Sequence, residues 1–391
     1  MGRLLLALML LATPAMAADP LEVRIGLIRV QREAELPISR LDLPPDDLGT
    51  AGAALAIEEN NTTGRFMGQA YALEAKDAAP GEALAAYDAL REAGIDLIVT
   101  LAPADDLAAL AEKAEADGVL LLNAGATDDA LRTTRCLPAT LHVSPSRAIL
   151  ADGLAQFLML KKWDAWFLIH GSHPEDTAWA NALRRAARKF GAKIVEERLY
   201  EDTGGARRTD TGYVQVQKQM PVFTQRAAAH DVVIAADEAG VFAEYLPYHT
   251  WDAAPVAGSA GLRPLRWHPA NEAWGATQYQ RRFEKMHGRR VRPEDYDAWL
   301  AVRVIGEAVT RTKSAAPADI LAYATGEDFE LGVFKGTKVT FRPWNRQLRQ
   351  PVLLAHDRII VSVSPQTPYL HRTSQLDTLG FDAPESQCDF D

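Results

Sequence analysis

Segments with the pattern of β-strands alternate with segments with the pattern of α-helices along most of this chain. Val23–Ile28 has the apolar pattern of a first strand, and Thr50–Asn60 has the period of a half-buried helix. The alternation continues with strands expected at 70–75, 95–100 and 119–122 and helices expected at 81–93 and 106–116. Such spacing predicts a mostly parallel sheet covered by helices on both faces.

The same alternation resumes after Ser144. Helices are expected at 146–160, 176–190, 239–248, 274–288 and 295–312, and strands at 165–169, 193–199, 232–235 and 255–258. The polar, glycine-containing stretch Glu201–Gly212 is expected to form a surface loop. After Phe329, apolar residues alternate as short strands separated by Pro and Gly. The sequence therefore predicts two α/β domains of one style, which agrees with a length of 391 residues, since one hydrophobic core rarely organises so many.

The N-terminus, Met1–Ala17, has the composition of an export signal. Arg3 provides a basic start, Leu4–Ala12 is apolar, and Ala15-Met16-Ala17 fits the small-x-small pattern that signal peptidase recognises. We expect a mature protein that begins at Ala18 and lies in the periplasm, with an uncleaved N-terminal helix as the alternative. No other run approaches the roughly 20 apolar residues of a membrane span, so no embedding in the membrane is expected.

Charge and cysteine content narrow the function further. The formal net charge is −10, without a basic face for phosphates, so nucleic acid is not expected as a partner. The two cysteines, Cys136 and Cys388, lie far apart in the sequence. In an oxidising compartment such a pair predicts a structural disulfide that holds the C-terminal tail, with two free thiols as the alternative.

Motifs for catalysis and cofactors are not found where this scaffold would need them. The first strand is not followed by a glycine-rich phosphate loop, and there is no Gly-x-Ser-x-Gly motif. His170 and His173 have a spacing that is weak evidence for a metal site. We therefore expect neither an enzyme nor a cofactor, and the metal content stays open.

Several segments together resemble the periplasmic branched-chain amino-acid-binding proteins of ABC importers, over nearly all of the mature chain. They are 52–60 (GAALAIEEN) with Gly64, 121–127 (LLNAGAT), 190–193 (FGAK) and 296–298 (YDA). A narrower resemblance is to the substrate-binding proteins associated with pyrroloquinoline quinone-dependent alcohol dehydrogenase systems. It is carried by 212–217 (GYVQVQ), 220–225 (MPVFTQ), 244–248 (EYLPY), 250–252 (TWD), 274–278 (WGATQ), 341–344 (FRPW) and 346–351 (RQLRQP).

The resemblance implies a type I periplasmic binding protein, an α/β fold with two doubly wound parallel-sheet lobes joined by three hinge crossings. The crossings are expected near Ser144, Leu265 and Leu331. The N-terminal lobe would then comprise 18–144 and 266–330, and the C-terminal lobe 145–265 and 331–391. A small ligand would bind between the lobes at the carboxyl ends of the strands, and an inner-membrane ABC permease would recognise the closed form of a monomer.

Only some of the family's ligand-binding residues have a matching residue in this sequence. Gly125, Ala126 and Thr127 stand where the resemblance places the contacts with an amino acid's carboxylate and ammonium groups. The serine of the preceding strand's loop is replaced by Ala102, and the aromatic residue of the second lobe by Glu175. These replacements argue against a standard amino acid as the ligand.

Acidic residues follow several strands instead. They are Asp46 and Asp47, Glu175 and Asp176, and Asp237 and Glu238, with Ser259 in a further loop. Carboxylates from separate loops could bind calcium, a lanthanide or an organic cation. The alternative is that they cap helices, where acidic side chains are favoured.

Two functions are expected on these grounds. The first is a solute receptor of an ABC importer, linked to a quinoprotein alcohol dehydrogenase system. The alternative is a periplasmic accessory or sensor protein that binds a protein partner or a metal ion.

Overall fold

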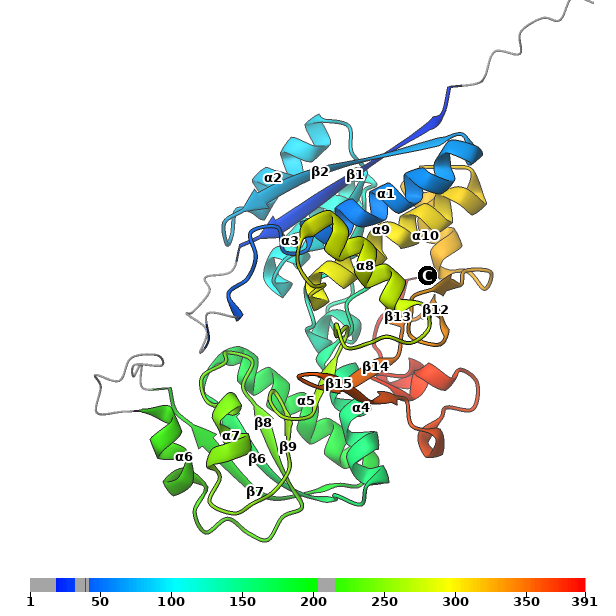
Figure 1. Cartoon of the computed structure of the whole chain (residues 1–391). Helices are drawn as coiled ribbons and strands as arrows, with labels where there is room; N and C mark the ends of the chain where they lie inside the picture. Colours follow the sequence, from blue (N-terminus) through cyan, green and yellow to red (C-terminus); the bar gives the residue numbers. More distant parts are fainter. Residues whose placement is uncertain (1–18, 32–38, 40–41, 203–214, 391) are drawn as a thin grey trace, which may run out of the picture.

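The computed structural model describes residues 19–31, 39, 42–202 and 215–390. It has two α/β lobes, drawn one above the other in Figure 1. Each lobe is built on one parallel sheet with helices on both faces, as the alternation of segments predicts. The expected signal Met1–Ala17 and most of the expected loop at 201–212 lie outside the described residues.

The first lobe contains a five-stranded parallel sheet in the order β2-β1-β3-β4-β5. Its strands are β1 (Leu21–Val30), β2 (Gln69–Ala78), β3 (Leu97–Leu101), β4 (Leu120–Asn123) and β5 (Thr140–His142). The central strands are entirely buried because helices cover both faces. This explains why they have continuous apolar runs and no alternation of polar and apolar residues.

Helices of the first lobe come from two distant parts of the chain. Helices α2 (Ala83–Glu92) and α3 (Ala104–Asp117) cover one face, and α1 (Thr50–Met67), α8 (Ala276–His287), α9 (Pro293–Thr312) and α10 (Pro317–Thr325) cover the other. Helices α1 and α9 pack closely at Gly52, where an added Cβ would lie only 1.8 Å from the Asp295 carbonyl oxygen. A larger residue at Gly52 would therefore push the two helices apart.

The second lobe contains a four-stranded parallel sheet in the order β7-β6-β8-β9. Its strands are β6 (Ala165–Gly171), β7 (Lys193–Tyr200), β8 (Val232–Ala236) and β9 (Val256–Gly258). Helices α4 (Arg147–Leu160) and α5 (Pro174–Phe190) cover one face. The other face packs against α6 (Val216–Thr224), a 3₁₀ helix (Ala243–Tyr245) and α7 (Leu246–His249).

The chain passes between the lobes three times. It leaves the first lobe between β5 and α4 and returns after β10 (Arg263–Leu265). The short strands β11 (Leu331–Gly332), β12 (Lys338–Phe341) and β13 (Leu348–Arg349) form an antiparallel sheet, and their buried side chains share the core of the first lobe. Strand β14 (Val352–His356) pairs with β10 on one side and with β15 (Ile359–Ser364) on the other, and both β14 and β15 pack against α4.

The third passage is therefore best placed between Arg349 and Val352, and this shifts the boundary that we propose for the second lobe. The sequence predicted it near Leu331, but Val339 and Leu348 belong to the first lobe's core. In β14, Val352 and Leu354 share the second lobe's core, whereas Leu353 between them packs into the first lobe's core. The alternating strands of this region have no sequence signal that tells which lobe they cover.

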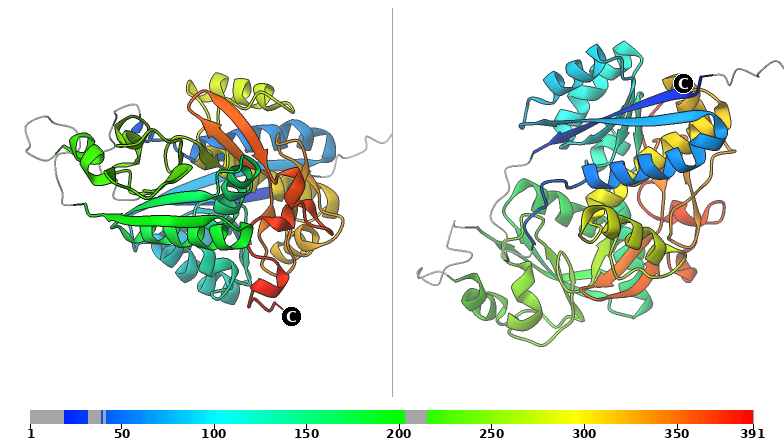
Figure 2. Two further views of the ribbon diagram at one scale, coloured as in Figure 1. Left: turned by 90° about the horizontal axis from the view of Figure 1, so that it is seen from below. Right: turned by 45° about the horizontal axis from the view of Figure 1, so that its top comes forward.

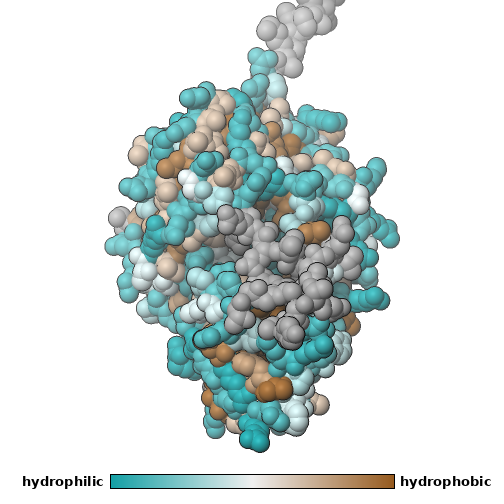
Figure 3. Space-filling model, turned by 90° about the vertical axis from the view of Figure 1, so that its left-hand side faces the viewer, coloured by the Kyte–Doolittle hydropathy of each residue, from teal (hydrophilic) through white to brown (hydrophobic). Residues whose placement is uncertain are grey.

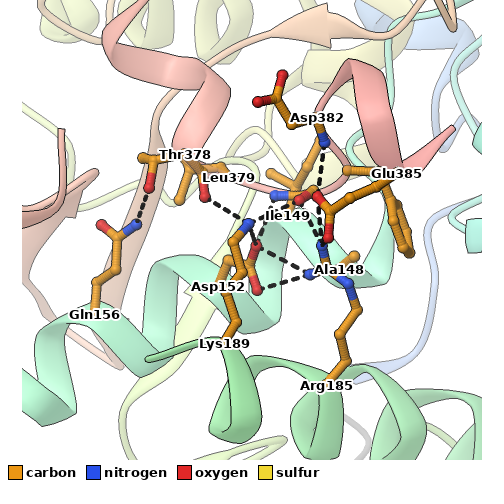
Figure 4. A network of polar contacts seen from close by, with 12 residues as sticks. Ala148, Ile149, Asp152, Gln156, Arg185, Lys189, Thr378, Leu379, Asp382 and Glu385 are labelled. Atoms are coloured by element: carbon orange, nitrogen blue, oxygen red, sulfur yellow. Dashed lines mark hydrogen bonds and ion pairs between the residues drawn. The ribbon is translucent and has the colours of Figure 1, made fainter. Parts of the chain in front are cut away.

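The C-terminal segment, Leu376–Cys388, contacts both lobes (Figure 2). In the second lobe, fully buried Asp152 accepts the backbone N–H of Gly380 at 2.8 Å and pairs with Arg185 and Lys189 (Figure 4). The disulfide Cys136–Cys388 attaches the end of this segment to the first lobe, with the two Cα atoms 5.4 Å apart. The disulfide expected from the sequence is confirmed.

One expected element is wrong and others were not anticipated. The helix expected at 239–248 is only a 3₁₀ turn and the short α7, since the backbone N–H groups of 241–243 bind the carboxylate of Asp237. Helices α6 and α10 were not predicted; α6 contains Pro221, which normally interrupts a helix.

Candidate functional site

A cavity of about 680 Å³ lies at the carboxyl edge of the first sheet. Its lining comes from the ends of β1, β2 and β3, the loop before α1, the loop after β4, the passage after β10 and the start of α9. The lining residues are Arg29, Val30, Gln31, Pro44, Pro45, Asp46, Leu48, Asp77, Leu101, Gly125, Arg266 and Glu294. Carboxyl edges of open α/β sheets are where such folds bind ligands.

Arg29 forms one wall of the cavity through the pairing of β1 with β2. The parallel register places Arg29 beside Asp77, and the two side chains form a bidentate ion pair with distances of 2.8 and 2.7 Å. Arg29 also donates to the backbone carbonyls of Asp46 and Leu48, which fixes the loop before α1. The hydrogen bond with Asp77 raises the pKa of Arg29, so the guanidinium stays charged.

Arg266 forms another part of the wall, in the second passage between the lobes. It donates from Nη1 to Ser144 Oγ at 2.7 Å and to Asp297 Oδ2 at 3.0 Å. Its Nη2 donates to Glu294 Oε1 at 2.8 Å. Because Ser144 belongs to the first passage, these bonds join two passages at the edge of the cavity.

Asp297 lies behind Arg266 and is completely buried. Burial raises the pKa of its carboxyl group, and the charge of Arg266 opposes that shift. Its Oδ1 atom has no hydrogen-bond partner among the described residues.

The loop after β4, which the sequence placed in the site, only partly reaches the cavity. Gly125 lines it, but the N–H groups of Gly125 and Ala126 donate to Asn123 Oδ1 at 3.1 and 2.8 Å. The carbonyl of Thr127 accepts the N–H of Arg147 at 2.9 Å. Ala102 is buried in the core, and its neighbour Leu101 lines the cavity instead.

The two acidic residues before α1 have different positions. Asp46 is exposed and lines the cavity. Asp47 turns away, because Arg289 donates to it at 2.8 Å and His287 lies 3.5 Å away. Only Asp46 of this pair is therefore available to a ligand in the cavity.

In the second lobe, two of the expected site residues are caps of local structure. Asp237 accepts three backbone N–H groups, from residues 241–243, at 2.6–2.8 Å, and its own N–H donates to Ser259 Oγ. Asp176 is buried and accepts the N–H groups of Ala239 and His173. Burial raises the pKa of Asp176. Both carboxylates therefore bind backbone N–H groups of their own lobe, as in the alternative interpretation that the acidic residues cap local structure.

Glu238 and Glu175 remain at the surface of the second lobe. Glu238 forms a bidentate ion pair with Arg147, at 2.8–3.0 Å, and the other guanidinium nitrogen of Arg147 lies 3.0 Å from Asp128 of the first lobe. Burial opposes the charge of Arg147, but these carboxylates outweigh it and raise its pKa. Glu175 is half-buried in the first turn of α5. Arg147 therefore links loops of both lobes.

Arginines, rather than acidic residues, organise the site, and none of them was among the site residues expected from the sequence. Arg29 ends an apolar strand, and Arg147 and Arg266 directly follow two of the expected crossings. Those positions, at a strand end and next to the crossings, could have indicated site residues. The pairing of Arg147 with Glu238, however, spans 91 residues and has no local sequence pattern.

The acidic residues in the loops after the strands do not form a metal site in the part of the chain that the structure describes. No group of three or more His, Cys, Asp or Glu side chains is placed to hold a metal ion there. The face that carries the carboxyl edges is mainly hydrophilic over its described residues (Figure 3).

The two-lobed fold and the cavity at a sheet's carboxyl edge agree with a comparison of sequences. Residues 47–356 match the family described as periplasmic binding protein. The chain belongs to that family. No curated protein matches the sequence significantly.

Solved structures similar to this periplasmic binding protein share its fold over almost the whole chain. A branched-chain amino acid ABC transporter ligand-binding protein from Burkholderia xenovorans is 15% identical, with a TM-score of 0.72, and the match covers 94% of this chain and 99% of that one. An ABC transporter substrate-binding protein from Sphaerobacter thermophilus is 17% identical, with a TM-score of 0.70 and coverage of 92% and 100%. The Brucella ovis leucine-, isoleucine-, valine-, threonine- and alanine-binding protein, in its closed conformation, is 17% identical, with a TM-score of 0.66 and coverage of 95% and 98%.

The family match shows a periplasmic binding protein, and the solved structures show that it shares the fold of binding proteins from ABC transporters. Among the described residues, no helix combines the length and apolar character needed to cross a bilayer.

Proposed function

We propose that this protein is the periplasmic receptor of an ABC importer and that it binds a small solute in the cavity beside Arg29 and Arg266. The observation that carries the proposal is the position of the cavity. It lies at the carboxyl edge of a parallel sheet, and one wall is formed by a passage between the lobes. A cavity of about 680 Å³ suits a small organic molecule.

Ligand binding would be coupled to hinge closure through the residues of that wall. Arg266 contacts Ser144 of the first passage, and Glu294 contacts both the cavity and Arg266. A solute that meets Arg266 or Glu294 therefore acts on the segments that must bend when the lobes close. The closed state is favoured only by contacts that the open state lacks.

Export by the N-terminal signal, a monomeric state and recognition by an inner-membrane permease complete this proposal. The resemblance of segments such as 341–344 and 346–351 supports a link to a quinoprotein alcohol dehydrogenase system. The alternative is an accessory or sensor protein that uses the same fold to bind a protein partner or a cation.

Thermal unfolding of the mature protein against a panel of small solutes tests the proposal. The panel contains amino acids, amines, alcohols, aldehydes, acids, the quinone, and calcium and lanthanide ions. A solute at 100 times its Kd stabilises the folded state by about 2.7 kcal/mol and raises Tm. The variant Pro45→Trp fills the cavity and should abolish the shift.

Ile359→Trp is the matched control, because Ile359 is 58% exposed on β15 and does not line this cavity. It should keep the full shift. A shift that survives Pro45→Trp would place the solute elsewhere. If no member of the panel shifts Tm, the accessory alternative gains support.

A further inference from the structure

We infer that the cavity selects a small organic cation that lacks a carboxylate, such as an alkylamine, and that it discriminates against amino acids. This inference rests on the proposed function, since it specifies the ligand of the same cavity. It depends on which hydrogen-bond donors of the lining are already used and on the charge that remains.

Two backbone donors of the loop after β4 are occupied by the protein itself. The N–H groups of Gly125 and Ala126 point to Asn123 Oδ1. Asn123 is completely buried, and its Nδ2 contacts the Ala126 carbonyl at 2.9 Å and His142 Nδ1 at 3.1 Å. A carboxylate at this loop would have to displace a side chain that is held on both of its polar atoms.

Side-chain donors at the neighbouring strand end are also missing. Leu101 and Ala102, which end and follow β3, have no hydroxyl group. A ligand carboxylate buried there would gain no hydrogen bond from these two side chains in place of its lost hydration, and lost hydration is costly for an ion.

Both guanidinium groups of the lining are already neutralised. Arg29 is held by both carboxylate oxygens of Asp77 and by two backbone carbonyls. Arg266 is held by Glu294, Asp297 and Ser144. A ligand carboxylate would compete with ion pairs that are within 3.0 Å, and its entry would separate them.

The remaining charge favours a cation. The lining carries three carboxylates, from Asp46, Asp77 and Glu294, against the two guanidiniums. Asp77 and Glu294 are the partners of those guanidiniums, so the carboxylate of exposed Asp46 is the excess charge. Pro44, Pro45 and Leu48 lie beside it and provide an apolar surface for an alkyl chain. Opposite charge and apolar contact together match an alkylammonium ion.

Matched pairs of ligands that differ only in the carboxylate test this inference. Isoamylamine is compared with leucine, agmatine with arginine, and isoamyl alcohol serves as the neutral analogue of isoamylamine. Calorimetric titration of the full mature protein should show each amine binding at least about tenfold more tightly than its amino acid. Isoamyl alcohol should bind more weakly than isoamylamine.

The variant Asp46→Asn provides a second measurement. It should weaken isoamylamine binding about tenfold, because it removes the unpaired carboxylate. The control Asp42→Asn removes an exposed carboxylate that does not line the cavity and should leave the Kd unchanged. Circular dichroism spectra and Tm values of both variants verify that they fold.

Each other outcome contradicts the inference in a defined way. If leucine binds more tightly than isoamylamine, the cation inference is wrong and the receptor proposal stands. Equal binding of isoamyl alcohol and isoamylamine, or no effect of Asp46→Asn, would remove the role of charge. If none of these ligands binds, the cation inference is also wrong, and the broader panel with Pro45→Trp then decides the receptor proposal.

Discussion

Acidic residues that follow strands have opposite roles in the two lobes. In the second lobe, Asp237 is 4% exposed and its carboxylate is saturated by three backbone N–H groups. In the first lobe, Asp46 is exposed at the cavity and keeps its carboxylate available. An aspartate in a loop between a strand and the next helix therefore builds a turn in one lobe and lines a cavity in the other.

The difference comes from the backbone donors in the next few residues of each segment. Asp237 is followed at once by an irregular turn whose N–H groups need acceptors. After Asp46, by contrast, α1 begins at Thr50, and the N–H of its N-cap residue Gly49 is bound by Asp295. The N–H groups of Leu48 and Ala51 are likewise bound, by the carbonyls of Pro45 and Asp47. The available partners, rather than the acidic residue itself, decide its role.

The largest expected effect is on stability, from Asp237→Ala. Three buried N–H groups would lose their acceptor, and each costs about 1–3 kcal/mol, so we expect a loss of roughly 4 kcal/mol. Urea unfolding followed by circular dichroism measures it. A loss below about 1 kcal/mol would mean that the carboxylate is not the main acceptor of these groups.

A buried lysine in the first lobe, Lys335, sharpens the comparison, because folding is expected to remove its charge. Burial lowers the pKa of Lys335 from 10.5 to about 7, and Asp297 only partly opposes the shift. Between pH 7 and 9.5 the unfolded chain binds a proton at this lysine that the folded chain does not. The free energy of unfolding should therefore rise with pH across this window, by up to about 1.4 kcal/mol per pH unit.

Lys335→Met removes this titration and should flatten that rise. Urea unfolding at several pH values from 7 to 9.5, for both proteins, tests it. Parallel pH profiles would show that Lys335 is charged in the folded protein throughout this range.

A smaller effect is expected when the second capping carboxylate is displaced. An added Cβ at Gly171 would lie 2.1 Å from Asp176 Oδ2, so Gly171→Ala should push this carboxylate away from its N–H partners. We expect a loss of about 2 kcal/mol, similar to Asp176→Ala. The double variant Gly171→Ala/Asp176→Ala should then lose little more free energy of unfolding than Asp176→Ala alone, and a double-mutant cycle measures this difference.

The smallest effect is expected for the stability of Asp46→Ala. Since this carboxylate is exposed, the free energy of unfolding should change by less than about 0.5 kcal/mol. Urea unfolding measures it beside Asp237→Ala. A loss comparable to that of Asp237→Ala would abolish the contrast between the lobes.

The fold could be predicted from the sequence because its signals are local. Buried strands such as β3 and β6 have continuous apolar runs, and α4 begins directly after the capping residue Ser146, as its pattern indicated. The turn after β8 was mistaken for a helix because its conformation depends on the hydrogen bonds of Asp237.

The site could be predicted only in outline. The resemblance led to Gly125 and the composition to Asp46, and both line the cavity. Arg29 and Arg266 depend on partners 48 and 31 residues away, and no periodicity connects residues at such distances. The occupation of two N–H groups by Asn123 likewise becomes visible only in three dimensions.

The bond between Cys136 and Cys388 closes a covalent ring over a separation of 252 residues. The ring contains the whole second lobe and the later part of the first, including α8, α9 and α10. A single cut by a protease anywhere inside this ring therefore releases no fragment. The nicked protein would run as one chain on a denaturing gel until a reductant opens the disulfide.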